Sequence, residues 1–448
     1  MRKKILEIIK PKALDAKEIV EQLNDTIEGQ FAAKKTLAIA VCNIGRRSKL
    51  IAAGDVMAKE VLNSHVLMAG PTGTGKTEMA KRLGDGGSPV FITTATQYTE
   101  IGYVGNDITS IIEELVIVAK RKIEGILYDE LKDESRERAI NIILKILSKR
   151  DDDARTIAQI RDKLAKGELD DIQIEIQVSN NDRNASKKPP TGAGVSVFVS
   201  ETLGKIFNSN SHDKKRKVTD IGTALSLLSR EEFNKMLDED AIIDAALQYA
   251  QSHGIIFIDE IDKLCKTDAS QRGGVSTKGV QRDLLPLLSG TKIETKFGYV
   301  DTSRILFITA GAFHIAKKSD LMPELLGRLP VEVDFHSLSK ENLVNILQNP
   351  VKGLIRQNIH SLRMSNVELK FESSAVSAIA DVAVNMNFVQ EDIGARRLNT
   401  IMSYLLQDLL FETPIDNKKK KQYIIDKEYV DRRLKDFYKE EKWDQYMI

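Results

Sequence analysis

The chain has 448 residues, of which 42% are hydrophobic and 29% charged, as expected for a globular protein of two or three domains. Its 66 Lys and Arg residues balance 65 Asp and Glu residues, so net charge gives no argument for nucleic acid or an anionic membrane as a partner. Two distant cysteines and scattered histidines argue against a zinc site, and no run is long enough to span a bilayer.

Strands and helices alternate in the first hundred residues. Residues 15–47 carry apolar side chains at helical spacing, and the apolar run SHVLMAG at 64–70 predicts a buried strand. A helix over 77–83 and a second strand over 88–96 follow. This order is typical of an α/β domain.

The middle of the chain is dominated by charged helical sequence. Residues 107–122 predict an apolar helix, and 123–170 a solvated helical region. The alternating segment 171–178 predicts a half-buried strand, and the polar residues 180–194 a mobile loop. The run KKRKV at 214–218 is typical of a nuclear import or nucleic-acid signal, but its polar surroundings favour a flexible, solvated segment.

Two more buried strands follow, GIIFIDE at 254–260 and SRILFITAG at 303–311. From residue 337 the pattern is mainly helical, with a short strand near Val367 and a basic turn at 417–422. The sequence therefore predicts an α/β fold, in which a parallel sheet is covered on both faces and is followed by a smaller, mainly helical domain.

The segment GPTGTGKT at 70–77 fits the phosphate-loop pattern G-x-x-x-x-G-K-[ST], between a predicted strand and a predicted helix. Its glycines allow backbone N–H groups to face phosphates at a helix N-terminus. Lys76 is expected to reach the β- and γ-phosphates, and Thr77 to ligate Mg²⁺. We therefore expect ATP and Mg²⁺ as cofactors. The same segment supplies further nucleotide-binding residues, namely Gly73, Thr74, Gly75 and Glu78.

Two acids complete this expected site. Asp259 ends a predicted strand beside the phosphate loop and can hold the Mg²⁺ shell, and Glu260 can polarise the attacking water. The sequence separation of Lys76 and Asp259 far exceeds the roughly 30 residues that a βαβ unit needs. A large insertion is therefore expected between them.

Six segments occur in order: IEGQFAAKKTLAIAV, GPTGTGKTEMAKRL, TEIGYVGND, GIIFIDEIDKLCK, ELLGRLPVEV and DIGARRL. Over nearly the whole chain, they resemble the HslU (ClpY) family of AAA+ unfoldases. The resemblance implies a cytoplasmic homohexamer that threads protein substrates into a dodecameric threonine peptidase, HslV, and binds neither nucleic acid nor membrane. It implies an AAA+ domain at 1–108 and 247–336, an inserted, mainly helical intermediate domain at 109–246, and a small helical domain at 337–448.

The resemblance also implies roles for single residues. Arg328 matches an arginine finger, Glu324 a nucleotide-contacting position and Arg396 the sensor arginine of the small domain, while Ile27 and Glu28 would lie along the adenine. Without the resemblance, both arginines would be assigned to salt bridges.

The chain departs from the family in four places, one of which is its ending at 442–448. Glu28 replaces an apolar residue, the glycines in KRLGDGGSP predict an early helix end, and Gly311 stands where a polar sensor side chain is often found. We therefore assign no sensor role in that strand.

The segment TEIGYVGND places Tyr103 and Val104 between Gly102 and Gly105. By the resemblance, these two side chains line the central pore and grip substrates, because an aromatic ring contacts many sequences with few rotamers to freeze. On residue type alone, Tyr103 would be a packed strand-end residue. The apolar tail KWDQYMI, residues 442–448, would insert between the peptidase subunits.

Three alternative functions remain. One is an AAA+ motor acting on nucleic acid, which a basic pore loop would favour. Another is a stand-alone chaperone that remodels proteins. The third is the function of ClpX, a related unfoldase that serves a different peptidase. ClpX has an N-terminal zinc domain and an IGF-type loop that docks on the peptidase, and neither is found in this sequence.

Overall fold

A computed structural model describes Ile5, Glu7 and residues 15–59, 64–99, 107–147, 154–179, 214–265, 277–350, 353–414 and 420–435. The chain divides into two compact units. One comprises Met1–Lys10 and Ala119–Gln248, and the other comprises Pro11–Val118 and Tyr249–Ile448. Helices α5 (Ser110–Leu147) and α9 (Glu239–His253) run through the points of division.

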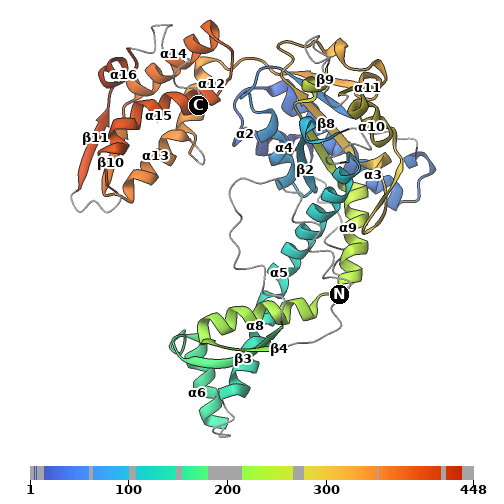
Figure 1. The fold of residues 1–448 in the computed structure, drawn as a ribbon, viewed down its shortest axis with the longest axis vertical. Helices are drawn as coiled ribbons and strands as arrows, with labels where there is room; N and C mark the ends of the chain where they lie inside the picture. Colours follow the sequence, from blue (N-terminus) through green and yellow to red (C-terminus); the bar gives the residue numbers. More distant parts are fainter. Residues whose placement is uncertain are drawn as a thin grey trace. The chain divides into compact units, whose positions relative to one another are not determined.

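The larger unit is built on a five-stranded sheet with the order β2-β5-β8-β1-β9, and all its pairs are parallel (Figure 1). Every residue of β1 and β8 is buried, as required of central strands covered on both faces. The sheet consists of β1 (Val66–Ala69), β2 (Val90–Thr94), β5 (Ile255–Asp259), β8 (Leu306–Gly311) and β9 (Val331–Asp334).

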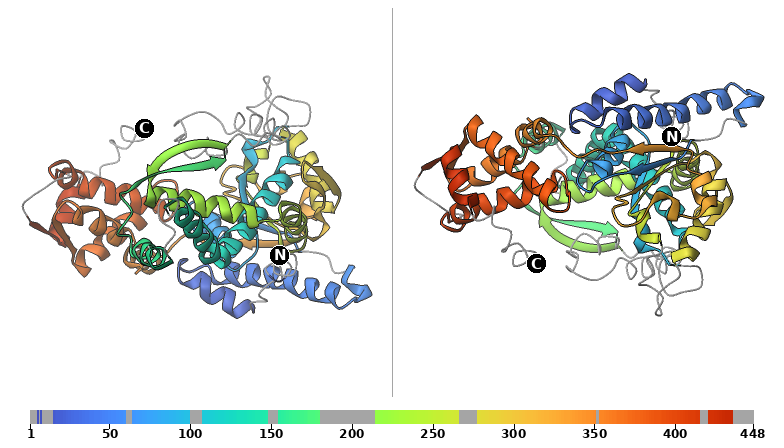
Figure 2. Two further views of the ribbon diagram at one scale, coloured as in Figure 1. Left: turned by 90° about the horizontal axis from the view of Figure 1, so that it is seen from below. Right: turned by 90° about the horizontal axis from the view of Figure 1, so that it is seen from above.

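Helices pack on this sheet through apolar side chains. The N-terminal helices, in blue, lie on one side of the sheet and contribute Leu23 and Leu37 to a core shared with Phe257 (Figure 2). The helices of this part are α2 (Ala16–Asn24), α3 (Phe31–Ala52), α4 (Lys76–Asp85), α10 (Thr277–Ser289) and α11 (Pro323–Gly327). Short 3₁₀ turns lie at η1 (Val56–Lys59), η2 (Ala95–Gln97), η5 (Ile261–Leu264), η7 (Thr302–Arg304) and η8 (Lys318–Asp320).

The end of the chain forms a helical subdomain with its own apolar core, which includes Leu343, Ile379 and Leu405. Local capping defines its helix starts: the Ser339 hydroxyl accepts a hydrogen bond from Asn342 N, and the Asp426 carboxylate accepts one from Tyr429 N. Its helices are α12 (Lys340–Gln348), α13 (Leu354–Arg363), α14 (Ser373–Val389), α15 (Arg396–Phe411) and α16 (Lys427–Leu434), and β10 (Val367–Phe371) pairs in parallel with β11 (Lys421–Ile425).

The smaller unit combines helices with one antiparallel pair of strands, β3 and β4. Ile174 and Ile176 face its core, whereas Gln173, Glu175 and Gln177 are exposed, as in a half-buried strand. The Asp220 carboxylate caps the following helix by accepting from Thr223 N at 2.8 Å. Besides α5 and α9, this unit contains α6 (Ala154–Ala165), β3 (Gln173–Ser179), β4 (Lys214–Asp220) and α8 (Ile221–Met236).

Most predicted elements are confirmed, but three local interpretations are wrong. The run KKRKV lies in β4, where pairing with β3 satisfies its backbone while Arg216, Lys217 and Val218 stay exposed. Of the basic turn predicted at 417–422, residues 417–419 lie outside the described residues, and Lys421 and Gln422 lie in β11. The helical pattern at 15–47 is interrupted after Asn24, because Gly29 and Gln30 adopt left-handed backbone angles, with φ of 64° and 53°.

Strand β9 and the hairpin of β6 (Lys292–Thr295) and β7 (Gly298–Asp301) were not predicted, since four residues carry too little periodicity. The helix after the phosphate loop ends early, as predicted, at Asp85, with Gly84 in its last turn and Gly86 and Gly87 after it. Residues 180–194, which were predicted to be a mobile loop, lie outside the described residues. None of the described helices has the length and apolar character needed to cross a membrane.

Two buried histidines lie near the amino ends of the strands. His65 Nδ1 accepts from Phe307 N at 3.2 Å, and its Nε2 lies 3.2 Å from the Leu288 carbonyl oxygen. A neutral ring with its proton on Nε2 satisfies both partners. Burial lowers the pKa of His65 to about 4, and it also lowers the pKa of His253 to about 4.

Because the pKa values of these histidines are lowered in the folded chain, we predict that the free energy of unfolding decreases in mild acid. Both remain neutral in the folded chain down to about pH 4, whereas in the unfolded chain they bind protons below about pH 6.5. Their contribution to the free energy of unfolding is therefore complete above pH 6.5. It falls as the pH decreases towards 4, by at most about 1.4 kcal/mol per pH unit for each histidine. Urea unfolding between pH 7 and 5 measures this slope.

His65→Gln keeps a donor and an acceptor but cannot titrate, so its stability should fall less steeply with decreasing pH than that of the wild type. His360→Gln, on the exposed side of α13, is the matched control and should keep the wild-type slope. Equal slopes for all three proteins would contradict the prediction.

Candidate nucleotide-binding site

A cavity of about 900 Å³ lies where the central strands of the larger unit end. In parallel α/β sheets, ligands bind at these carboxyl ends. The turn after α2, the loop after β1, the acids after β5 and the start of α15 all contribute to the cavity wall. Its lining includes Ile27, Glu28, Gly73, Thr74, Gly75, Lys76, Thr77, Glu78, Asp259, Glu260 and Arg396.

Lys76 opens α4 and is largely buried. Its ammonium donates to the carbonyl oxygens of Gly70 at 2.6 Å and Pro71 at 2.8 Å. Burial lowers the pKa of Lys76 to about 8, against the opposing effect of Asp259. A phosphate oxygen is a stronger partner for this ammonium than a carbonyl oxygen, so the loop fits a phosphate ligand.

Thr77 and Asp259 meet at the expected metal position. The Thr77 hydroxyl donates to Asp259 Oδ2 at 2.6 Å, which joins the start of α4 to the end of β5. Within the described part of the chain, no cluster of three or more His, Cys, Asp or Glu residues can hold a metal ion. Two adjacent protein oxygens nevertheless fit Mg²⁺, which takes its remaining ligands from phosphates and water.

Glu260 adopts a left-handed backbone conformation, with φ of 58° and ψ of 35°. Its backbone N–H donates to Asp259 Oδ1 at 2.9 Å, and its carboxylate lies 3.4 Å from the Thr96 hydroxyl. Such backbone angles are uncommon for a residue other than glycine and concentrate at functional sites. They set Glu260 at the cavity wall, one residue beyond the acid that faces Thr77.

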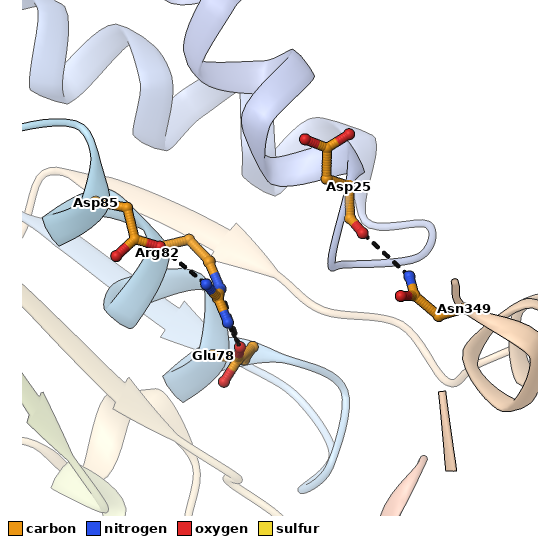
Figure 3. A network of polar contacts seen from close by, with 5 residues as sticks. All are labelled: Asp25, Glu78, Arg82, Asp85 and Asn349. Atoms are coloured by element: carbon orange, nitrogen blue, oxygen red, sulfur yellow. Dashed lines mark hydrogen bonds and ion pairs between the residues drawn. The ribbon is translucent and has the colours of Figure 1, made fainter. Parts of the chain in front are cut away.

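Glu78 also lines the cavity, but its side chain is already paired. Arg82 donates from Nη2 to Glu78 Oε1 at 2.7 Å and from Nη1 to Asp85 Oδ2 at 2.9 Å (Figure 3). The carboxylate is therefore held along α4 by a cation. This pairing leaves the backbone of Glu78, in the first turn of the helix, as the group suited to a nucleotide.

One end of the cavity is formed by the turn after α2, where the Ile27 side chain lies close to the phosphate loop, 3.4 Å from a Cβ added to Gly75. Ile27 is buried there, and the Thr26 hydroxyl is buried without a hydrogen-bond partner among the described residues. Glu28 accepts from Asn345 Nδ2 at 3.1 Å. A buried hydroxyl without a partner is costly unless a ligand satisfies it, so this end fits a polar heterocycle such as adenine.

The start of α15 approaches the phosphate loop closely. Ala395 N donates to the Gly73 carbonyl oxygen at 3.0 Å, which brings Arg396 to the cavity. Gly73 and Gly394 have φ of 69° and 55°, and a Cβ added to Gly73 would lie 2.0 Å from the Ile393 carbonyl oxygen. Only glycines permit this contact between the two backbones.

Two predicted residues lie away from the cavity of their own chain. Glu324 in α11 and Arg328 at its C-terminal end are both exposed and do not line it. Tyr103, Val104 and the tail at 442–448 lie outside the described residues.

The sequence reasoning overlooked several cavity residues, including Thr26, Asp262 and Lys263. A second acid three residues after Asp259 was a usable signal for Asp262, but the hydroxyl of Thr26 left no pattern. The structure also explains Gly311, because a Cβ there would lie 2.8 Å from Asp262 Oδ1 and 2.6 Å from the Phe313 ring.

Two known domain families match this chain, one before and one within its C-terminal helical subdomain. An AAA domain of the Cdc48 subfamily matches residues 187–332, and the C-terminal D2-small domain of ClpB matches residues 338–425. Together with the phosphate loop and the Asp259–Glu260 pair, these matches define an AAA+ ATPase.

Proteins described as ATP-dependent protease ATPase subunit HslU match nearly the whole chain. Those of Rickettsia rickettsii, Rickettsia conorii and Rickettsia felis are each 40% identical over 432 residues, which cover 95% of this chain and 94% of the relative. The chain belongs to the HslU family.

The close approach of Gly394 to Gly73 predicts the effect of one methyl group. Gly394→Ala would place its Cβ 2.6 Å from the Gly73 carbonyl carbon, so the two segments must separate. We expect ADP affinity to fall by about tenfold or more, because such overpacking typically costs about 1–3 kcal/mol. Titration with a fluorescent ADP analogue measures this loss.

Gly54→Ala is the matched control, since Gly54 has φ of 74° but nothing within 4 Å of an added Cβ. It introduces similar backbone strain at the end of α3 without a clash. Equal ADP affinities for the two variants would show that the contact between Gly394 and Gly73 does not matter for binding.

Proposed function

We propose that this chain is the ATPase subunit of an ATP-dependent protease and unfolds protein substrates for a partner peptidase. The observation that carries the proposal is a nucleotide cavity with both its phosphate loop and its acidic pair, in a chain of the HslU family. The proposed assembly is a cytoplasmic homohexamer on a dodecameric, HslV-like threonine peptidase. In it, residues 1–108 and 247–336 form the motor, 109–246 the intermediate domain and 337–448 the small domain.

The residues of the cavity have separate tasks in hydrolysis. Lys76 binds the β- and γ-phosphates, and Thr77 and Asp259 supply protein oxygens for the metal. When bound, Mg²⁺ neutralises charge on the phosphate oxygens. Glu260 orients the attacking water and accepts its proton.

Arg328 and Glu324 are proposed to act on the nucleotide of a neighbouring subunit. Their exposure, and their position outside the cavity of their own chain, support a role at a subunit boundary. Arg396 is proposed to connect the nucleotide to the small domain, since it starts α15 next to the phosphate loop. Tyr103 and Val104 are proposed to line the pore and pull substrates.

Glu260→Gln should leave ATP binding intact and reduce turnover at least about a hundredfold, because the water loses its base while the phosphate loop is unchanged. Lys76→Thr should instead abolish binding. Nucleotide titration and phosphate release measure the two effects separately. Glu428→Gln, an exposed position on α16, controls for the loss of one charge. Normal turnover in Glu260→Gln would contradict the assignment.

The partner is tested by mixing the full chain with the threonine peptidase of its own organism and ATP, and following cleavage of a small peptide. We expect stimulation, and we expect it to disappear when Tyr446, Met447 and Ile448 are deleted while ATPase activity is retained. Stimulation that survives the deletion would place the docking surface elsewhere. No stimulation by the intact chain would favour a stand-alone chaperone.

A further inference from the structure

Lys34 is a buried cation that the catalytic roles above do not use. It lies in the second turn of α3, and only 3% of it is exposed. Its ammonium donates to the Ile27 carbonyl oxygen and, at 2.7 Å, to Asn24 Oδ1. Asn24 is the last residue of α2 and Ile27 lies in the turn that links α2 to α3, so one side chain connects the end of α2 to that turn.

The turn held by Lys34 forms one end of the nucleotide cavity. Thr26 lies between the two acceptors, and both Thr26 and Ile27 line the cavity. The Thr26 hydroxyl is buried without a partner in the described part of the chain, although a hydroxyl can both donate and accept. The Ile27 carbonyl oxygen, by contrast, already accepts from Lys34.

Burying an ammonium is unfavourable, and burial does lower the pKa of Lys34, against the opposing effect of Glu28. An apolar side chain would pack at this position without that cost. A buried lysine at this position is therefore explained by the hydrogen bonds that its ammonium donates to the Ile27 carbonyl oxygen and to Asn24 Oδ1.

The opposite side of the turn is held separately by α12. Asn349 Nδ2 donates to the Asp25 carbonyl oxygen at 3.0 Å, as Figure 3 shows, and Asn345 Nδ2 donates to Glu28. Asn345 lies in α12, and Asn349, four residues later, is the C-cap residue of the same helix. These contacts reach Asp25 and Glu28, whereas Lys34 reaches Asn24 and Ile27, so the contribution of Lys34 can be removed alone.

We propose that Lys34 is a positioning residue for the base of the nucleotide, holding the turn so that the Ile27 side chain packs on the purine and the Thr26 hydroxyl bonds to its edge. The inference rests on the proposed ATPase function and adds two residues, Lys34 and Thr26, to the site. It separates the cavity into a phosphate end set by Lys76 and a base end set by Lys34.

The test compares ATP with inorganic triphosphate, which has the phosphates but no base. In Lys34→Met, ATP affinity should fall about tenfold or more, as expected when a hydrogen-bonded charged group is removed, while triphosphate affinity stays within about twofold of wild type. Lys35→Met changes the adjacent, exposed lysine of the same helix and should alter neither affinity. Calorimetric titration in the presence of Mg²⁺ measures both ligands.

Thr26→Val provides a second test that leaves Lys34 in place. It removes only the hydroxyl, so it should weaken ATP binding and leave triphosphate binding unchanged. Equal losses for both ligands in Lys34→Met, or ATP affinity unchanged in both variants, would overturn the inference while leaving the ATPase function intact. A wild-type chain that binds neither ligand would overturn the proposed function, and the inference with it.

Discussion

The hydrogen bond between Thr77 and Asp259 depends on the parallel pairing of strands that are far apart in sequence. β1 pairs with β8 and β8 with β5, so the carboxyl ends of β1 and β5 lie at the same edge of the sheet. The loop after β1 then delivers Thr77 at the start of α4, and β5 ends on Asp259. Any slip of register in β8 would separate these two oxygens, which are proposed to bind the metal.

The cavity is completed by segments outside the sheet, and each is attached through a different kind of contact. The backbone of Gly394 contacts the backbone of Gly73 directly, and this contact leaves no space for a side chain at either residue. The base end depends instead on polar side chains, from Lys34 on one side and from α12 on the other. A nucleotide in this cavity therefore contacts elements whose positions are set by steric fit and elements whose positions are set by hydrogen bonds.

The elements and site residues that could be predicted from the sequence are those that depend on strong local patterns. The apolar run before Gly70 predicted β1, and the glycine spacing around Lys76 predicted the phosphate loop. Nearly all the nucleotide residues expected within one chain line the cavity. The strand forms as predicted, and the predicted residues lie together at the cavity, because a buried parallel strand and a phosphate loop each require particular residues at fixed spacing.

What the sequence did not predict depends on pairing over long distances. β4 carries four basic residues and has no apolar alternation, so only its pairing with β3 makes it a strand. β9 and β11 are short, and β11 is stabilised by a parallel partner about fifty residues earlier. Thr26 lies outside the segments that resemble the family, and Lys34 lies in one of them without an assigned role, since the significance of both comes from what surrounds them in the folded chain.

The pairing of β2 with β5 has a consequence for how this protein can vary. These strands are neighbours in register, from Val90 opposite Ile255 to Thr94 opposite Asp259, although the chain forms a separate unit between them. The part of the smaller unit at 119–248 is thus an enlarged crossover connection between two adjacent parallel strands. Lengthening such a connection costs little, about 0.6 kcal/mol for each doubling. The inserted unit can therefore change in size and surface over evolution while the register that holds Asp259 in place stays the same.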